Sequence, residues 1–175
     1  MNRKKYIRLW ILLIMLPVTI ALGGCGGSYM SPERALRDFS NRIEQGNLDN
    51  LTLTIYYRNI LSTFHFPFSA EDFVGRGMYE RAIVVDGNEL EKHIELLQQI
   101  NADSLIPFTS NRPHLVRLYY VFEVRGRKIF SFVPRLAEED STMLINGIEF
   151  KWDDAFFDII RPFLPEGSPW LRDVL

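Results

Sequence analysis

The sequence predicts an α+β fold: a single domain with an antiparallel or mixed sheet of about five to six strands and about three helices packed mainly on one face. Three observations support this fold class. Some stretches place apolar residues at helical spacing. Others alternate apolar and polar residues, as half-buried strands do. Glycine-containing turns join two pairs of these alternating stretches directly, without the strict strand-helix-strand order of a parallel sheet.

The first predicted helix lies in the stretch SPERALRDFSNRIEQGN. Ser31 is a good N-cap, Pro32 fits the first helical position, and Gly46 is the expected C-terminal stop. The apolar face of this helix is formed by Leu36, Phe39 and Ile43. This amphipathic pattern predicts a helix with one buried side.

Two strands are predicted next. Residues 51–57 alternate apolar side chains with Thr and Tyr, and residues 79–85 read YERAIVV. The connection between them, residues 61–77, is broken by a proline and two glycines. We expect it to be partly ordered, with a turn of helix after Ser69.

Two further helices are predicted. One covers residues 88–100 and is capped by Asp86 or Asn88. The last begins after Asp153 and ends at the prolines that follow it. Its inward side chains are expected to be Phe156, Phe157 and Ile160.

Two hairpins lie between these helices. Residues 114–136 contain two apolar runs around Arg125-Gly126-Arg127, and residues 142–152 contain Asn146-Gly147. Glycine in a two-residue turn supplies the positive φ that tight hairpins need. In the first hairpin we expect Glu123 to pair across the strands with a base such as Lys128.

The N-terminal segment resembles an export signal. Four basic residues precede a run of fourteen uncharged residues, 9–22, that contains Pro17. A membrane-spanning helix needs about 20 apolar residues, whereas a signal-peptide core needs about 7 to 15. We therefore expect a secretory signal.

The end of this run, Leu22-Gly23-Gly24-Cys25, resembles the lipobox of bacterial lipoproteins. The resemblance implies that the Gly24–Cys25 bond is cleaved and that the Cys25 thiol carries a diacylglyceryl lipid. It also implies a lipoprotein exported to the extracytoplasmic face of a bacterial cell membrane. Two acyl chains hold a protein firmly to a bilayer. A free Cys25 after an ordinary signal peptide, or an uncleaved anchor, are the alternatives.

These boundaries give residues 1–24 as signal peptide, 25–30 as lipidated tether and 31–175 as the domain. Removing the signal leaves sixteen Lys and Arg against twenty-two Asp and Glu, a net charge of −6. An acidic domain argues against nucleic-acid binding. Because Cys25 is the only cysteine, no internal disulfide forms, and burial of apolar side chains must stabilise the fold.

No catalytic motif is present. The chain lacks a glycine-rich phosphate loop, a G-x-S-x-G elbow and an H-E-x-x-H motif. No two of His65, His93 and His114 have helical ligand spacing, so we expect neither a metal site nor another cofactor. The acidic runs 138–140 and 153–154 fit a solvated loop and a helix cap. We assign no catalytic residue.

The best candidate for a binding surface is the segment STFHFPF, in which Phe64, Phe66 and Phe68 alternate. Alternating aromatic residues beside a proline can form a platform for a sugar, a peptide or a protein partner. The alternative is that these rings cover the core from an edge strand. Tyr119, Tyr120 and Phe122 are similarly expected to divide between a core side and a surface side of their strand.

The leading functional hypothesis is a lipid-anchored envelope lipoprotein with a non-catalytic binding or protein-interaction domain. Its expected partners are the membrane, through Cys25, and an envelope protein or a glycan. The alternatives are a small cell-surface hydrolase, whose site would be assembled from distant residues, and a structural role in the envelope. A concave pocket with converging ionisable groups would favour the enzyme, and an aromatic surface would favour binding.

Overall fold

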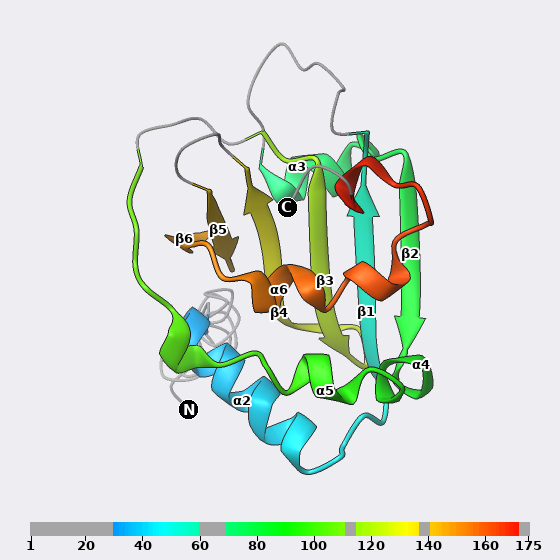
Figure 1. Ribbon diagram of the computed structural model, residues 1–175, viewed down its shortest axis with the longest axis vertical. Helices are drawn as coiled ribbons and strands as arrows, with labels where there is room; N and C mark the ends of the chain where they lie inside the picture. Colours follow the sequence, from blue (N-terminus) through cyan, green and yellow to red (C-terminus); the bar gives the residue numbers. More distant parts are fainter. Residues whose placement is uncertain (1–29, 60–68, 111–114, 137–140, 172–175) are drawn as a thin grey trace, which may run out of the picture. The chain divides into compact units, whose positions relative to one another are not determined.

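The structure, a computed structural model, describes residues 30–59, 69–110, 115–136 and 141–171. These residues form one six-stranded antiparallel sheet in the order β2-β1-β3-β4-β5-β6 (Figure 1). The strands are β1 (Leu51–Tyr57), β2 (Arg81–Asp86), β3 (Leu118–Val124), β4 (Arg127–Arg135), β5 (Thr142–Ile145) and β6 (Ile148–Lys151). The predicted α+β fold class is confirmed.

Five α-helices lie within the described ranges, more than the three or so expected. They are α2 (Pro32–Glu44), α3 (Ala70–Gly75), α4 (Gly87–Glu91), α5 (Ile94–Leu97) and α6 (Asp154–Asp158). Short 3-10 turns, η1 (Ala102–Ser104), η2 (Arg161–Phe163) and η3 (Pro169–Leu171), complete the elements. Figure 1 shows α2, α5 and α6 in front of the sheet, on what we call the helical face.

The helical face carries the main core. Alternate residues of the central strands are fully buried there, including Tyr120, Phe122, Phe130 and Phe132. Phe39 of α2 packs on two of these rings, with centroid distances of 4.8 Å to Phe122 and 5.0 Å to Phe130. The amphipathic helix predicted from the sequence thus covers the aromatic centre of the sheet.

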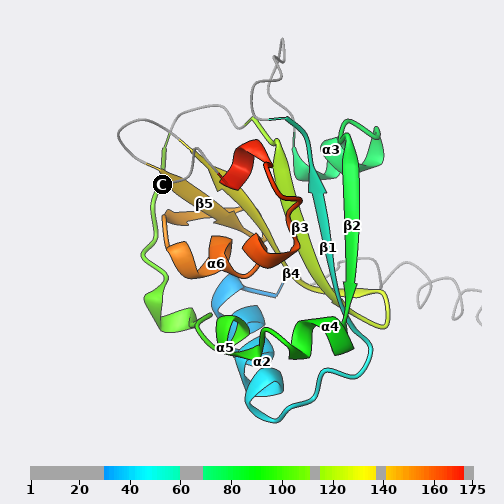
Figure 2. The ribbon, with the colours of Figure 1, turned by 45° about the vertical axis from the view of Figure 1, so that its right-hand side comes forward.

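The opposite face, which we call the second face, has a smaller core. Phe73 of α3 is fully buried against Val116, Val133 and Leu144. Figure 2 shows α3 on the side of the sheet away from α2, α5 and α6. Most helices therefore cover one face, as predicted, and α3 covers part of the other.

The ends of α2 follow the predicted signals. The Ser31 side chain accepts a hydrogen bond from the Arg34 backbone N–H, and Pro32 occupies the first helical position. Gly46, at φ +62°, ends the helix. Its N–H donates to the Ile43 carbonyl, and the next N–H donates to the Arg42 carbonyl, which is the Schellman pattern.

Both hairpin turns have the predicted conformation. Arg125 and Gly126 have φ values of +52° and +73°, and Asn146 and Gly147 have φ values of +51° and +83°. Positive φ at both central residues is the signature of a type I′ turn, whose twist matches that of the flanking strands.

The predicted helix over residues 88–100 is wrong in its continuity. Asp86 caps α4 through the Glu89 N–H, but the chain departs from helical geometry at His93, with φ −122° and ψ 27°, before α5 begins. Leu90 and Leu97 are still both buried. The break at His93 lets α4 and α5 pack Leu90 and Leu97 against the same core. The closing helix is likewise shorter than expected, since α6 ends at Asp158 and η2 begins only at Arg161.

Candidate functional site

The residues assigned to lipid attachment and to the binding surface lie outside the described residues. These are Gly24, Cys25, Phe64, Phe66 and Phe68. No helix within the described ranges has both the length and the apolar character needed to cross a bilayer. The candidate site lies on the second face of the sheet.

Three tyrosines meet on the second face, and we call them the tyrosine cluster: Tyr56, Tyr79 and Tyr119. The Tyr56 ring lies edge-on to Tyr79 at 4.9 Å and stacks on Tyr119 at 6.0 Å between ring centroids. All three side chains are half-buried. They therefore combine a fixed arrangement with a solvent-accessible surface.

The strand register produces this cluster. Tyr56 of β1 and Tyr119 of β3 are directly opposite each other, so their side chains leave the sheet on the same face. Tyr79 precedes β2. Its ring lies edge-on to the ring of Phe73 of α3, with 6.2 Å between the ring centroids. Because Phe73 is fully buried, α3 gives the cluster a rigid support.

Burial is the main cause that raises the pKa of two of the three phenols, Tyr119 and Tyr56. Burial is the main cause that raises the pKa of Tyr119 to about 12; a hydrogen bond with Ser131 acts in the opposite direction. Burial also raises the pKa of Tyr56, with smaller contributions from Tyr79 and Glu123. A neutral phenol can donate a hydrogen bond to a ligand, but it is a poor nucleophile at neutral pH. The cluster is therefore equipped for binding.

The expected cross-strand placement of Glu123 is confirmed, since Glu123 is opposite Lys128 in the β3–β4 register. Glu123 is also opposite Thr52 in the β1–β3 register, four residues along the strands from the Tyr56–Tyr119 pair, and its charge makes a small contribution to raising the pKa of both tyrosines.

A second polar group lies at the other end of the sheet, where Glu149 of β6 receives hydrogen bonds from three residues. Arg135 Nη1 lies 2.6 Å from Glu149 Oε1, Thr142 Oγ1 donates to the same oxygen at 2.7 Å, and the Ser110 N–H donates to Oε2 at 2.9 Å. The Arg135 and Glu149 side chains are only 12% and 9% exposed. Burial alone would raise the pKa of Glu149, but these hydrogen bonds lower it overall. A carboxylate so fully occupied is a structural clamp and a poor general base.

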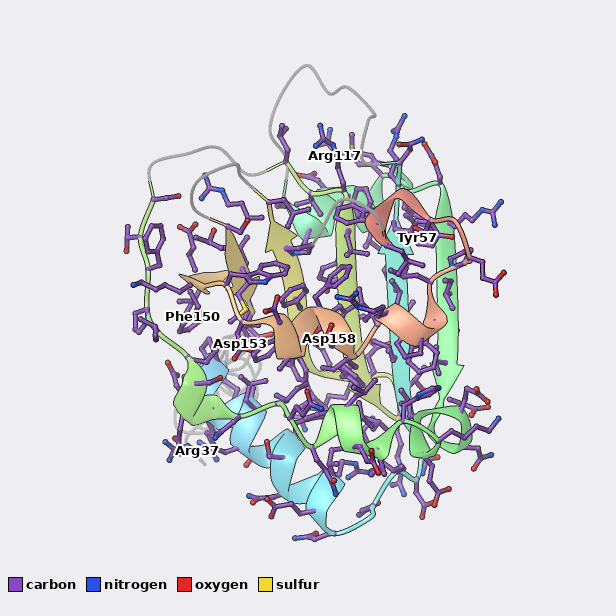
Figure 3. All side chains as sticks on the ribbon, viewed as in Figure 1. Arg37, Tyr57, Arg117, Phe150, Asp153 and Asp158 are labelled. Carbon is purple, nitrogen blue, oxygen red and sulfur yellow. The ribbon has the colours of Figure 1, made fainter. Side chains whose placement is uncertain are left out.

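The other ionisable candidates have structural partners. Asp153 caps α6 by accepting from the Ala155 N–H, as predicted, and Asp158 pairs with Arg161 at 2.9 Å. Figure 3 labels Asp153, just before α6, and Asp158, at its end, both on the helical face. His93 packs edge-on against Phe163 at 5.1 Å. Within the described ranges, no three His, Cys, Asp or Glu residues are grouped to hold a metal ion.

The tyrosine cluster was not predicted from the sequence as a site, although the two sides of β3 were expected to differ. Tyr120 and Phe122 are fully buried on the helical face, and Tyr119 is half-buried on the second face, as that separation implies. The available signal was that Tyr56 in β1 and Tyr119 in β3 each place an aromatic side chain on the face opposite the main core. Only the register brings Tyr56 and Tyr119 together.

No family model, curated protein or solved structure matches this chain. The function proposed below therefore rests on the residues and their geometry.

Proposed function

We propose that this protein is a bacterial envelope lipoprotein, held to the membrane by a lipid on Cys25, whose domain is a non-catalytic binding module. The tyrosine cluster is its ligand-contacting surface. The observation that carries this proposal is the contact among three half-buried tyrosines, two of which, Tyr56 and Tyr119, have a pKa raised by burial. Tyrosine supplies a rigid apolar ring and a polar tip, which is why it is enriched at binding surfaces.

The ligand that best suits this surface is a glycan of the cell envelope. The apolar faces of sugar rings pack on aromatic rings, and their hydroxyls exchange hydrogen bonds with phenols and carboxylates. The Ser131 hydroxyl, which forms a hydrogen bond with Tyr119, supplies a further polar group beside the rings. A protein partner is the competing outcome of the test.

The predicted aromatic segment, residues 60–68, lies in the chain between β1, which carries Tyr56, and α3, which supports Tyr79. Phe64, Phe66 and Phe68 therefore belong to a segment attached on both sides to elements of the cluster. We include them in the proposed contact surface.

The binding proposal is tested with isolated envelope polysaccharide titrated into the purified protein by calorimetry. Tyr79→Ala should weaken binding by at least about tenfold, which corresponds to about 1.4 kcal/mol. Ile148→Ala is the matched control, because Ile148 is an exposed apolar residue on the opposite sheet edge, 51% exposed. Equal affinities for the two variants would contradict the assignment of the site. If the protein binds an envelope protein and no polysaccharide, that protein replaces the glycan as the proposed ligand.

The anchor is tested separately in cells. Cys25→Ser should abolish incorporation of labelled palmitate and change the processing of the precursor, because the thiol is the proposed attachment atom. The label in the gel band measures palmitate incorporation, and the mobility of the band measures processing of the precursor. Cell fractionation measures retention at the membrane. Retained labelling in the variant would contradict lipidation at Cys25 without bearing on the tyrosine cluster.

A further inference from the structure

The tyrosine cluster contains both Tyr–Tyr ring contacts found within the described ranges. The centroids of the Tyr56 and Tyr79 rings are 4.9 Å apart, with an interplanar angle of 66°, and those of Tyr56 and Tyr119 are 6.0 Å apart, with an angle of 26°. Tyr120, by contrast, is fully buried among phenylalanine rings. Because the three rings of the cluster are only half-buried, they combine close approach to one another with access for a small oxidant.

The backbone keeps Tyr79 beside Tyr56. The Glu80 N–H donates to the Tyr57 carbonyl at 3.0 Å, so the residues before β2 stay next to the end of β1. Figure 2 shows α3 beside the upper ends of these two strands. On its other side the Tyr79 ring rests on the buried Phe73 of α3. A backbone hydrogen bond and a ring contact thus both hold Tyr79 in position.

Two phenols at this distance can be joined by oxidation. A phenol that loses one electron and one proton becomes a phenoxyl radical, whose unpaired electron is shared with the Cε carbons beside the oxygen-bearing carbon. Two such radicals combine through a Cε–Cε bond, and each ring regains its aromaticity when the hydrogen on that carbon moves to the oxygen. The joined ring centroids are then separated by two ring radii and one carbon–carbon bond, which is less than the 4.9 Å between Tyr56 and Tyr79.

We infer that Tyr56 and Tyr79 form an oxidative cross-linking site, at which a haem peroxidase and its peroxide join the two rings into a dityrosine. Hydrogen peroxide takes up the two electrons and two protons that the phenols lose, and it leaves as two molecules of water. The bond ties β1 to the residues before β2. The single cysteine of the chain leaves no disulfide to make such a link. The inference depends on neither the lipid anchor nor the glycan proposal.

Tyr119, the other neighbour of Tyr56, is placed less well for this reaction. Tyr56 and Tyr119 are opposite each other in two central strands, so the sheet fixes the backbone of both. Their rings are stacked, so ring faces meet where Cε edges would have to meet. Tyr79 precedes β2 and lies outside the strand ladder, so its ring has the freedom to move the remaining distance. The geometry therefore favours Tyr79 as the partner of Tyr56.

The test treats the purified full chain with a haem peroxidase and hydrogen peroxide, at a protein concentration low enough to suppress reaction between chains. The wild type should gain dityrosine fluorescence, remain a single chain on a denaturing gel and lose the mass of two hydrogen atoms. Digestion and mass spectrometry should identify Tyr56 linked to Tyr79. The linked peptide should be lost in Tyr79→Phe, which keeps the ring but removes the phenol.

Tyr57→Phe is the matched control. Tyr57 follows Tyr56 in the sequence, but its side chain is buried in the core of the helical face. This variant should form the Tyr56–Tyr79 link as the wild type does. A Tyr57→Phe protein that loses the link would show that the coupling does not follow the ring contacts of the second face.

Stability gives a second readout, because the new bond closes a loop that contains residues 57–78. A cross-link reduces the conformational freedom of the unfolded chain, so the treated wild type should unfold at a higher urea concentration than treated Tyr79→Phe. Linkage of Tyr56 to Tyr119, products formed only between chains, or oxidation confined to Met78 beside the cluster overturns the inference. Equal yields of the link in the folded chain and in the urea-unfolded chain also overturn it, because the folded geometry then contributes nothing.

Discussion

At the scale of single residues, Glu149 holds three parts of the chain together. It joins Ser110, which precedes β3, to Arg135 at the end of β4 and to Thr142 at the start of β5. The pair with Arg135 is buried, so neither charge is solvated by water. Removing one partner of a buried pair leaves the other charge uncompensated, which costs far more than the loss of an exposed pair.

Glu149→Gln should therefore lower the free energy of unfolding by about 3 kcal/mol, measured by urea denaturation at neutral pH. Asp103→Asn is the matched control, because its pair with Arg37 is 3.3 Å long and both side chains are mostly exposed. That control should lose less than about 1 kcal/mol. Similar losses in the two variants would show that the Glu149 clamp is not desolvated.

The same residue predicts a dependence of stability on pH. The folded-state pKa of Glu149 is below its ordinary value of 4.5, so its contribution is complete above that pH and is lost as the pH falls through the lowered pKa. Wild-type stability should decline in this acid range more steeply than that of Glu149→Gln. Parallel declines in urea titrations of the two proteins would contradict the assignment.

At the scale of elements, two glycines act by different physical means. Gly46 ends α2 at φ +62°, and a Cβ there would meet nothing within 4 Å. Gly87 joins β2 to α4, and a Cβ there would lie 2.3 Å from the Leu48 carbonyl oxygen. The first position needs a left-handed backbone conformation, and the second needs space between two backbone segments.

Gly87→Ala should consequently destabilise the domain by about 1–3 kcal/mol, because backbone atoms must move apart. Gly46→Ala should cost about 1 kcal/mol through conformation alone. Gly46→Asn is the control and should be nearly neutral, since Asn tolerates the left-handed region. Thermal unfolding ranks the three variants. A Gly87→Ala protein as stable as the wild type would mean that β2 and the turn at Leu48 separate without cost.

At the scale of the whole molecule, one sheet separates two cores of unequal size. The larger, on the helical face, includes residues from α2, α4, α5 and α6. The smaller is formed by Phe73 with Val116, Val133 and Leu144, and it supports the tyrosine cluster. A change in the larger core should be transmitted through every strand, whereas a change in the smaller should remain near α3.

Phe39→Ala should cost about 3–5 kcal/mol and accelerate amide exchange throughout the sheet. Phe73→Ala removes the same side chain from the smaller core and should accelerate exchange mainly in α3 and near Tyr79. Native-state hydrogen exchange distinguishes the two patterns. Uniform acceleration in both variants would show that the two cores unfold as a single unit.

The sequence predicted much of the local structure because the causes are local. The Ser31 cap, the Asn146-Gly147 turn and the alternation of β1 each depend on neighbouring residues. The break at His93 was missed because the pattern of Leu90 and Leu97 is the same in one helix or two. Packing of both residues against the same sheet decides between them.

The amino-acid sequence by itself determined the fold class, the caps at Ser31 and Asp153, the hairpin turns and the alternation of β1, because these follow from conformational preference and apolar spacing. The tertiary structure alone decided that Tyr56 meets Tyr119, that Glu149 meets Arg135 and that β2 is left at an edge. Each of these depends on strand order and register. Those are set by the packing of the whole chain, since residues distant in sequence become neighbours only when the sheet has formed.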